Sequence, residues 1–422
     1  MRRLAFIFRN RACPYRGGGY SVRILLAVLV CFLALFDGPP LNAGDSWPLY
    51  IGKTKESGKI IVAQYRGDQP GIFAFDEVGE CPNQPFYISQ TDSLADKGLT
   101  NAIRYQVTDA HLHYVDFLQD SDGVEALLKA MSRAGVGHAM LNGLPLVKKW
   151  DAVDPRKPLY YLADDSRTYW YSAADVLVAR TVKSLPETDR KKFHPFICGF
   201  NPTDRNAIDH VRRMYEWYPD LWEGIGEILT RHDDLTALTY GEQPRANHIA
   251  LDPVYTFAAK HDLPVCIHSD ISSVWVHEPL YLHEMEEAVK KHPQTRFIWA
   301  HAGISRRVTV PSIVQVLRRM LKTYPNLWID LSWVVFPMDV YPDGKLNEEW
   351  VALVEEFPDR FMIGTDAVGH FDDYEKTIFR YYVLFDALSQ KTARLVAREN
   401  FLRILPHRVR KNLVDEPSNA VK

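Results

Sequence analysis

Eight short apolar runs, each followed by a helix-like segment, constrain the fold of this chain more than any other feature of its sequence. The runs are bounded by Pro, Gly or Asp, as buried strands are. The segments between them repeat apolar residues at spacings of three and four, which is typical of amphipathic helices. Eight strand–helix units in one continuous stretch favour the α/β class, and within it a (β/α)8 TIM barrel over a doubly wound sheet.

The predicted strands and helices alternate without interruption from residue 107 onward. The strands are 107–113, 136–141, 193–200, 222–229, 264–269, 296–302, 326–332 and 360–365. The helices are 123–134, 173–185, 207–218, 253–261, 280–292, 311–324, 348–357 and 392–405. We therefore predict a barrel over residues 105–410.

The remaining residues divide into an N-terminal leader, a small appendage and a polar tail. Residues 44–104 are rich in aromatic and turn residues, and the runs 60–63, 71–75 and 85–88 predict short strands. This segment is expected to be a small β-rich appendage without a catalytic constellation. Residues 411–422 form the polar C-terminal tail.

Six arginines precede an uninterrupted apolar run from Ile24 to Phe36. The run is shorter than the roughly 20 residues that span a bilayer, and it is followed by a small residue, Ala43. This pattern predicts a secretory signal peptide over residues 1–43, with an uncleaved N-terminal anchor as the alternative. We therefore expect an exported protein, periplasmic or secreted, or else one anchored to the membrane through this segment.

The charge of the chain excludes one class of partner. A formal net charge of -3 and a pI near 6.6 give no reason to expect nucleic-acid binding. Only Cys81, Cys198 and Cys266 lie outside the leader, so the chain is not a disulfide scaffold. The expected partner is a small-molecule substrate, and a homo-oligomer is left open.

Histidines and carboxylates occur where five of the predicted strands end. In a barrel the carboxyl ends of all strands lie at one face, where active sites are built. A single His or Asp at a strand end is more often a satisfied polar group or a helix cap than a ligand. Six such residues on five strands are improbable as independent accidents, so we expect a metal centre formed by His111, His113, Glu227, His268, His301 and Asp366.

The first two histidines are close in sequence. Residues i and i+2 of a strand point the same way, so His111 and His113 would converge on one point beyond the strand end. Asp109 has the same parity, and we expect it to orient its neighbours by hydrogen bonding rather than to ligate. Cys266 shares the parity of His268, which predicts a small buried side chain inside the barrel.

These motifs, in this order, resemble the amidohydrolase superfamily, in the branch often called amidohydrolase-related or amidohydrolase 2. The resemblance spans residues 107–405 and includes the family's closing helix at 397–405. It implies a metal-dependent TIM-barrel hydrolase. The motifs that carry it are Asp109-x-His111-x-His113, Ile267-His268, Ala300-His301-Ala302-Gly303 and Gly364-Thr365-Asp366.

The resemblance also implies roles for the six residues. His111, His113 and Asp366 would hold a first metal, with His268 as a further ligand. His301 would either ligate a second metal or act as a hydrogen-bonding electrophile, which makes it catalytic together with Asp366. Glu227 is similar in place to the carboxylate that Gly-x-Gly-Glu-Ile strands of TatD-type hydrolases contribute between two metals.

Imidazole and carboxylate ligands suit Zn²⁺, as one or two ions, with Mn²⁺ or Fe²⁺ as alternatives. Zinc can lower the pKa of bound water to about 7 and polarise a carbonyl, and Asp366 could transfer the water's proton to the leaving group. We expect hydrolysis of a C–N, lactone or other ester bond. A decarboxylase on the same metal barrel and a non-catalytic ligand-binding barrel are the alternatives.

The loops after the strands are expected to set specificity. An insert at 144–171 combines basic and aromatic residues, which suggests either a lid over an anionic or cyclic substrate or an aromatic surface cluster. His232 and Arg307 follow two of the strands and could also contact a carboxylate. The candidate substrate-binding residues are Arg231, Trp275, His277, Arg306 and His370.

Overall fold

The computed structural model describes residues 49–53, 60–65, 73–77, 103–148, 162 and 165–413. The chain divides into two compact units, Met1–Pro82 and Asn83–Lys422. The predicted leader at 1–43, the predicted strand at 85–88 and the tail after residue 413 lie outside the described residues. The predicted boundary between residues 104 and 105 therefore stays a prediction.

The described part of the first unit is a small antiparallel sheet. Its strands are β1 (Leu49–Lys53), β2 (Ile60–Tyr65) and β3 (Phe73–Glu77), in the order β1-β2-β3. The runs predicted at 60–63 and 71–75 correspond to β2 and β3, whereas β1 was not predicted. Ile61 of β2 pairs with Gly52 on one side and Glu77 on the other.

The second unit is built on eight parallel strands. Every neighbouring pair in this sheet is parallel, and Ala110 N donates to Ile363 O over 2.9 Å, which joins the first strand to the last. The sheet is therefore a closed barrel, as predicted. In spatial order the strands are β4 (Val107–Asp109), β6 (Val136–Leu141), β9 (Phe193–Ile197), β10 (Gly224–Leu229), β11 (Val265–His268), β12 (Phe297–Trp299), β13 (Leu327–Asp330) and β14 (Phe361–Met362).

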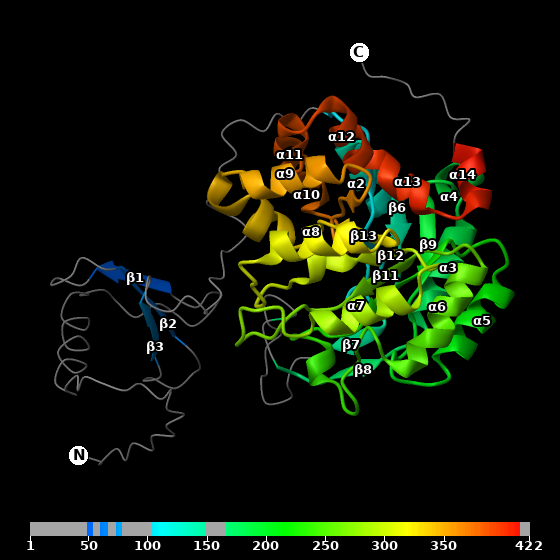
Figure 1. Ribbon diagram of the computed structural model, residues 1–422, viewed down its shortest axis with the longest axis horizontal. Helices are drawn as coiled ribbons and strands as arrows, with labels where there is room; N and C mark the ends of the chain where they lie inside the picture. Colours follow the sequence, from blue (N-terminus) through cyan, green and yellow to red (C-terminus); the bar gives the residue numbers. More distant parts are fainter. Residues whose placement is uncertain are drawn as a thin grey trace, which may run out of the picture. The chain divides into compact units, whose positions relative to one another are not determined.

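Helices surround the strands (Figure 1). Those between the strands are α2 (Val124–Ala134), α3 (Ala174–Ser184), α4 (Glu187–Arg190), α5 (Ala207–Trp217), α6 (Asp252–Lys260), α7 (Leu282–Lys291), α8 (Ile313–Thr323) and α9 (Glu348–Glu356). The chain then closes with α10 (Tyr374–Arg380), α11 (Tyr382–Ala387), α12 (Gln390–Arg394), η6 (Leu395–Glu399), α13 (Asn400–Ile404) and α14 (His407–Leu413).

Short elements complete the loops at the two faces of the barrel. Two small sheets pair β5 (Leu112–His113) with β15 (Ala367–Val368) and β7 (Leu146–Lys148) with β8 (Thr168–Trp170). Single turns of helix are η1 (Thr236–Leu238), η2 (Ile249–Leu251), η3 (Ala300–Gly303), η4 (Phe336–Val340) and η5 (Pro342–Gly344). In the described part of the chain, none of the helices combines the length and the apolar character needed to cross a membrane.

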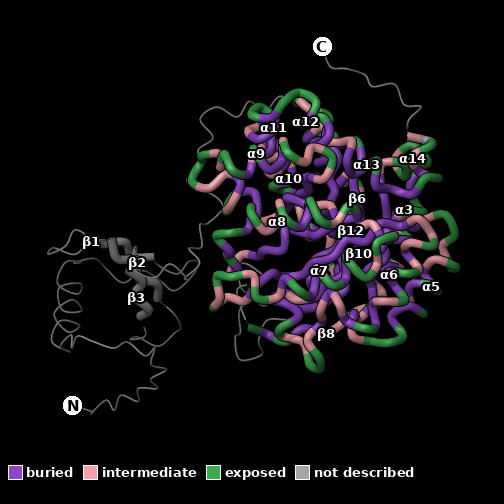
Figure 2. The backbone as a smooth tube through the Cα atoms, in the orientation of Figure 1, coloured by how far each residue is buried: buried purple, intermediate pink, exposed green. Residues whose placement is uncertain are grey.

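The helices pack on the barrel through one apolar stripe each. In α8 the buried residues are Ile313, Val314, Leu317, Met320 and Leu321, spaced at one, three and four as one face of a helix requires. Figure 2 shows the buried strands running through the centre of this unit and the exposed residues on outer helix faces and loops. Burial of these stripes holds the helices in place.

The interior of the barrel is filled by side chains from alternate positions of its strands. Met140, Phe196, Cys266 and Ile298 belong to one buried cluster there, which confirms the predicted orientation of Cys266. Phe401 of α13 joins the same cluster, with its ring 5.6 Å from that of His194 near the start of β9. The closing helix therefore seals the amino ends of the strands and leaves the carboxyl ends for a site.

The structure departs from the prediction mainly at element ends. The run at 296–302 is a strand only to Trp299, because η3 follows, and the run at 360–365 is a strand only at Phe361–Met362. The helix predicted at 392–405 consists of α12, η6 and α13. Helices α10 and α11 were not predicted from the sequence.

Candidate metal centre

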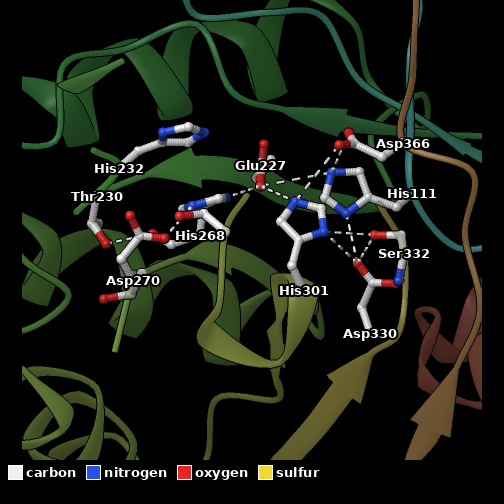
Figure 3. Close-up of polar contacts among 12 residues, drawn as sticks. His111, Glu227, Thr230, His232, His268, Asp270, His301, Asp330, Ser332 and Asp366 are labelled. Atoms are coloured by element: carbon white, nitrogen blue, oxygen red, sulfur yellow. Dashed lines mark hydrogen bonds and ion pairs between the residues drawn. The ribbon is translucent and has the colours of Figure 1, made fainter. Parts of the chain in front are cut away.

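The six residues predicted as metal ligands lie together at the carboxyl ends of the strands. His111 follows β4, His113 ends β5, and Glu227 lies within β10. His268 ends β11, His301 lies in η3 after β12, and Asp366 precedes β15. Figure 3 shows five of the six directed toward one another. The four histidines and Glu227 are buried, and the side chain of Asp366 is 11% exposed.

Glu227 lies at the centre of this group. Its Oε1 is 3.1 Å from His268 Nδ1, 3.5 Å from His301 Nε2 and 3.7 Å from His111 Nε2. Its Oε2 is 3.4 Å from His113 Nε2. One carboxylate therefore faces all four imidazoles, as a bridging ligand between two ions would.

Asp366 approaches the same imidazoles from the opposite strand. Its Oδ1 is 3.5 Å from His111 Nε2 and 3.2 Å from His113 Nε2. Its Oδ2 is 3.8 Å from His301 Nε2. The atoms of His111, His113 and Asp366, and separately those of His111, Glu227 and His301, all lie within 4.8 Å of one another. Either set could hold a metal ion.

The histidine tautomers fit a metal better than a network of hydrogen bonds alone. His113 Nδ1 is 2.8 Å from Gly143 O, and a carbonyl only accepts, so Nδ1 carries a proton and Nε2 is the ring nitrogen directed at the centre. His111 Nε2 lies 3.3 Å from His113 Nε2. Metal-binding histidines characteristically donate their other ring N–H to a carbonyl or carboxylate, as these residues do.

Asp330 and Ser332 orient two of the imidazoles and were missed in the sequence. His111 Nδ1 donates to Asp330 Oδ2 over 2.7 Å. Ser332 Oγ donates to the same oxygen over 2.5 Å and accepts from His301 Nδ1 over 2.8 Å. Both histidines thus present Nε2 to the centre. Asp330 ends β13, so the strand-end rule applied to the predicted strand at 326–332 would have found it.

His268 lies between two carboxylates. Its Nδ1 faces Glu227, and its Nε2 is 3.0 Å from Asp270 Oδ1. Asp270, two residues further along the chain, therefore directs Nδ1 rather than Nε2 of this imidazole into the centre. The third set of potential ligand atoms within 4.8 Å of one another belongs to His232, His268 and Asp270.

Three carboxylates, Glu227, Asp366 and Asp270, change the pKa values of the histidines they face. Burial alone would lower the pKa of His113, yet the hydrogen bonds to Asp366 and Glu227 raise it to about 9. Burial likewise opposes protonation of His268, whose pKa is raised to about 10 by Asp270 and Glu227. The pKa of Glu227 is held well below its usual value, because the imidazoles outweigh the effect of its burial. The centre attracts positive charge.

The backbone around the centre is fixed by close contacts. Asp109 Oδ1 accepts from the backbone N–H groups of His111 and Thr365, and its Oδ2 accepts from Thr365 Oγ1 over 2.7 Å. As expected from the sequence, Asp109 orients its neighbours and is not one of the six residues that face one another, which we call the cage. Burial raises the pKa of Asp109 to about 6. A Cβ on Gly364 would lie 2.6 Å from His111 Cβ, so only glycine lets these two strands approach.

A pocket with mostly apolar walls opens onto the cage. His232, which follows β10 and was named from the sequence as a possible contact to a carboxylate, is the polar residue of the wall outside the six predicted ligands. Burial and the nearby charge of His268 hold the pKa of His232 well below its usual value. Besides the cage residues and His232, the lining residues are Phe117, Leu144, Leu162, Leu229, Leu235, Trp333 and Val368.

The five predicted substrate-binding residues do not line this pocket. Arg231 donates to both carboxylate oxygens of Glu284, and Arg306 donates to both of Asp234. Trp275 is 83% exposed. His277 lies against Thr309, and His370 pairs with Asp122 at 2.8 Å. As substrate contacts these five residues remain predictions that the geometry does not support, because their polar groups have other partners or face solvent.

The predicted lid is described only in part, since residues 149–161 and 163–164 of the insert lie outside the described residues. Within the described part, Leu144 and Leu162 line the pocket, and Lys148 is buried and donates to Ser166 O over 3.2 Å. The first and middle parts of the insert thus contribute apolar wall to the site.

The family model with the description Amidohydrolase matches residues 228–406. His268, His301 and Asp366 lie inside this segment, and His111, His113 and Glu227 precede it. The match confirms the resemblance predicted from the motifs. Among curated proteins, a search finds no match to the chain.

Solved structures resemble the second unit at low identity. An uncharacterised TIM-barrel protein from Bordetella bronchiseptica is 13% identical, with 71% of this chain and 98% of that chain covered, at a TM-score of 0.47. A dihydroorotase from Campylobacter jejuni is 18% identical, with 71% of this chain and 82% of that chain covered, at a TM-score of 0.43. A 4-oxalomesaconate hydratase from Rhodopseudomonas palustris is 12% identical, with 73% of this chain and 97% of that chain covered, at a TM-score of 0.44.

Proposed function

We propose that this barrel of the amidohydrolase superfamily is a metal-dependent hydrolase that cleaves a C–N, lactone or other ester bond of a small molecule. The observation that supports this most is the position of Glu227, within 4 Å of four imidazoles whose outer nitrogens are engaged elsewhere. A buried arrangement of this kind is expensive for a protein to maintain unless a cation neutralises it.

The donor set favours Zn²⁺, with Mn²⁺ or Fe²⁺ as the alternatives, because imidazole and carboxylate ligands suit all three. His111, His113 and Asp366 would hold one ion, and Glu227, His268 and His301 would hold a second. When bound, zinc supplies a water molecule with a pKa of about 7 and an electrophile for a carbonyl oxygen.

The residues of the chain provide proton transfer and orientation. The pKa of Asp366 is lowered, because the neighbouring imidazoles His111 and His301 outweigh its burial, so this carboxylate is ionised, the form that can take a proton from water. Its partly exposed position lets it reach the pocket, where it can return the proton to a leaving group. With a single ion bound, His301, held through Ser332, would instead orient the carbonyl of a substrate.

The proposal is tested first by metal analysis of the purified full chain. Two equivalents of metal support Glu227 and His301 as ligands, and one equivalent places both in supporting roles. A screen over lactones, amides and carboxylated rings then identifies a substrate, with carbon dioxide release measured in parallel to detect a decarboxylase.

Variants at the centre complete the test. His111→Ala and Asp366→Asn are expected to abolish turnover, while Asp359→Asn, whose side chain is 66% exposed, keeps it. Full turnover in both centre variants, or the absence of bound metal from a protein reconstituted with Zn²⁺, would exclude the mechanism.

A further inference from the structure

His232 is the polar residue of the pocket wall that the metal centre does not use. It follows β10 and is 5% exposed. Apart from the cage residues and the indole of Trp333, the other described residues of the wall are aliphatic or phenyl side chains. A buried polar group in such a wall calls for a partner, since nearly all buried N–H groups are hydrogen-bonded.

The surroundings of His232 fix where its ring proton lies. The backbone N–H of Asp234 donates to His232 Nδ1 over 3.2 Å, and the backbone N–H of His232 donates to Thr236 Oγ1 over 2.9 Å. Because Nδ1 accepts, the ring carries its proton on Nε2. This Nε2 forms no hydrogen bond with any residue in the described part of the chain.

The position of the ring is equally fixed. It stacks on the imidazole of His268, with centroids 4.3 Å apart and planes at 20°, and lies 5.7 Å from the ring of Trp333. His268 in turn contacts Glu227 at the centre of the cage. A small molecule bound at the cage would therefore come within reach of His232 (Figure 3).

We propose that His232 is a specificity-determining residue, whose Nε2–H donates a hydrogen bond to an acceptor oxygen of the substrate, away from the reacting bond. This inference rests on the proposed function of the metal centre. It restricts the substrate to molecules with an apolar body and a second oxygen acceptor beyond the group that contacts the metal. Sites built to pair a buried donor discriminate strongly against analogues that lack the acceptor.

The test compares two hydroxamates of nearly the same shape. Succinamic hydroxamate carries a terminal amide, and 4-methylpentanohydroxamate carries an isopropyl group in its place, while both chelate metal through the same group. Binding is measured on the full chain loaded with Co²⁺, whose visible absorption reports occupation of the metal centre. The amount of Co²⁺ bound to each protein is measured first.

In His232→Phe, which keeps a flat ring but removes the donor, the Kd of the amide probe is expected to rise by about 10-fold or more, the typical effect of a lost buried hydrogen bond. The Kd of the isopropyl probe should change by less than about threefold. His232→Gln, which supplies an N–H donor, should restore part of the amide's affinity.

His248→Phe is the matched control. His248 is also buried, and its Nδ1 accepts from the backbone N–H of Ala250 over 3.2 Å, the same local bond that His232 makes. It does not line the pocket. This variant should leave the Kd of both probes unchanged.

Equal effects of His232→Phe on both probes, or no effect on either, would overturn the inference while leaving the metal centre intact. A loss of bound Co²⁺ in His232→Phe would overturn it too, since His232 would then be a ligand in the set with His268 and Asp270. Failure of the unmodified protein to bind Co²⁺ would instead count against the proposed function.

Discussion

Asp330 controls two imidazoles of the centre through hydrogen bonds outside the cage. In Asp330→Asn the side-chain amide can donate to His111 Nδ1, which favours the tautomer with a proton on Nε2 and removes the lone pair that would bind metal. We expect metal affinity to fall by about 10–100-fold, as for other residues that orient ligands. Competition with a chromophoric chelator measures the change.

The control for this prediction is Asp359→Asn, because Asp359 is exposed and distant from the imidazoles. Ser332→Ala should weaken binding less than Asp330→Asn, since it releases His301 and leaves His111 held. Metal affinity unchanged in Asp330→Asn would mean that the two tautomers are fixed in another way.

His138 makes stability depend on pH at the opposite end of the barrel. Burial, together with the charges of His194 and Arg398, lowers the pKa of His138 to about 3, whereas an unfolded histidine has a pKa near 6.5. As the pH falls below about 6.5, the unfolded chain binds a proton that the folded chain does not. The stability contributed by neutral His138 is therefore complete above that pH and declines as the pH falls toward about 3.

The variant His138→Gln separates this effect from other titrations. Between about pH 7.5 and about pH 5.5, the free energy of unfolding of the natural protein should fall by about 1 kcal/mol more than that of the variant. Urea denaturation at both pH values measures the difference. His194 Nε2 lies 3.2 Å from His138 Nδ1, and His194 Nδ1 lies 2.6 Å from Glu223 Oε2; both neighbours are present in both proteins. Parallel pH profiles would contradict the prediction.

The sequence was sufficient to predict which histidines and carboxylates come together at the strand ends, but not which of the polar residues in the loops line the pocket. Strand ends converge in any barrel, so His111, Glu227 and Asp366 could be grouped from position alone. Whether an arginine near the site is free depends on acids that lie far away in sequence. Arg231 pairs with Glu284 and Arg306 pairs with Asp234, and no local pattern in the sequence predicts these pairs.

At the scale of elements, the contact between β14 and β4 is set by the glycine that follows β14. In Gly364→Ala the added methyl group would lie 2.6 Å from His111 Cβ and 2.7 Å from its backbone N. The two strands must separate, so we expect a loss of about 1–3 kcal/mol in the free energy of unfolding and weaker metal binding. Urea denaturation and chelator competition measure the two effects.

Gly137→Ala is the matched control within the same sheet. Gly137 lies in β6, and a Cβ there would meet nothing within 4 Å. This change should leave stability and metal affinity close to those of the natural protein. If both variants behaved alike, backbone crowding at His111 could not explain the result.

The elements themselves were predictable where burial and periodicity agree. The strand at 136–141 matches β6, and the helix at 348–357 matches α9 to within one residue. Prediction failed where local geometry ends a strand early: in η3 His301 and Ala302 have φ of 52° and 54°, in the left-handed region. This turn directs His301 into the centre. The apolar run at 296–302 does not predict the turn.

At the scale of the whole second unit, the two ends of the barrel have different chemistry. The amino ends of the strands meet Phe401 and its apolar neighbours in α13, so that end is a closed floor that contributes stability. The carboxyl ends carry the candidate metal centre, the pocket and the loops between strands. Function can therefore change through the loops while the floor is kept, as is general for this architecture.

The pairing of arginines around the pocket also affects how ligands arrive. Arg231 is neutralised by Glu284, and Arg306 and Arg307 together are neutralised by Asp233 and Asp234. These three arginines thus add no excess positive charge that would steer an anion inward. Stopped-flow association of an anionic ligand should change by less than about threefold between low and high salt, whereas electrostatically guided binding slows steeply. The arginines beside the pocket thus leave encounter to diffusion and shape rather than to their long-range charge.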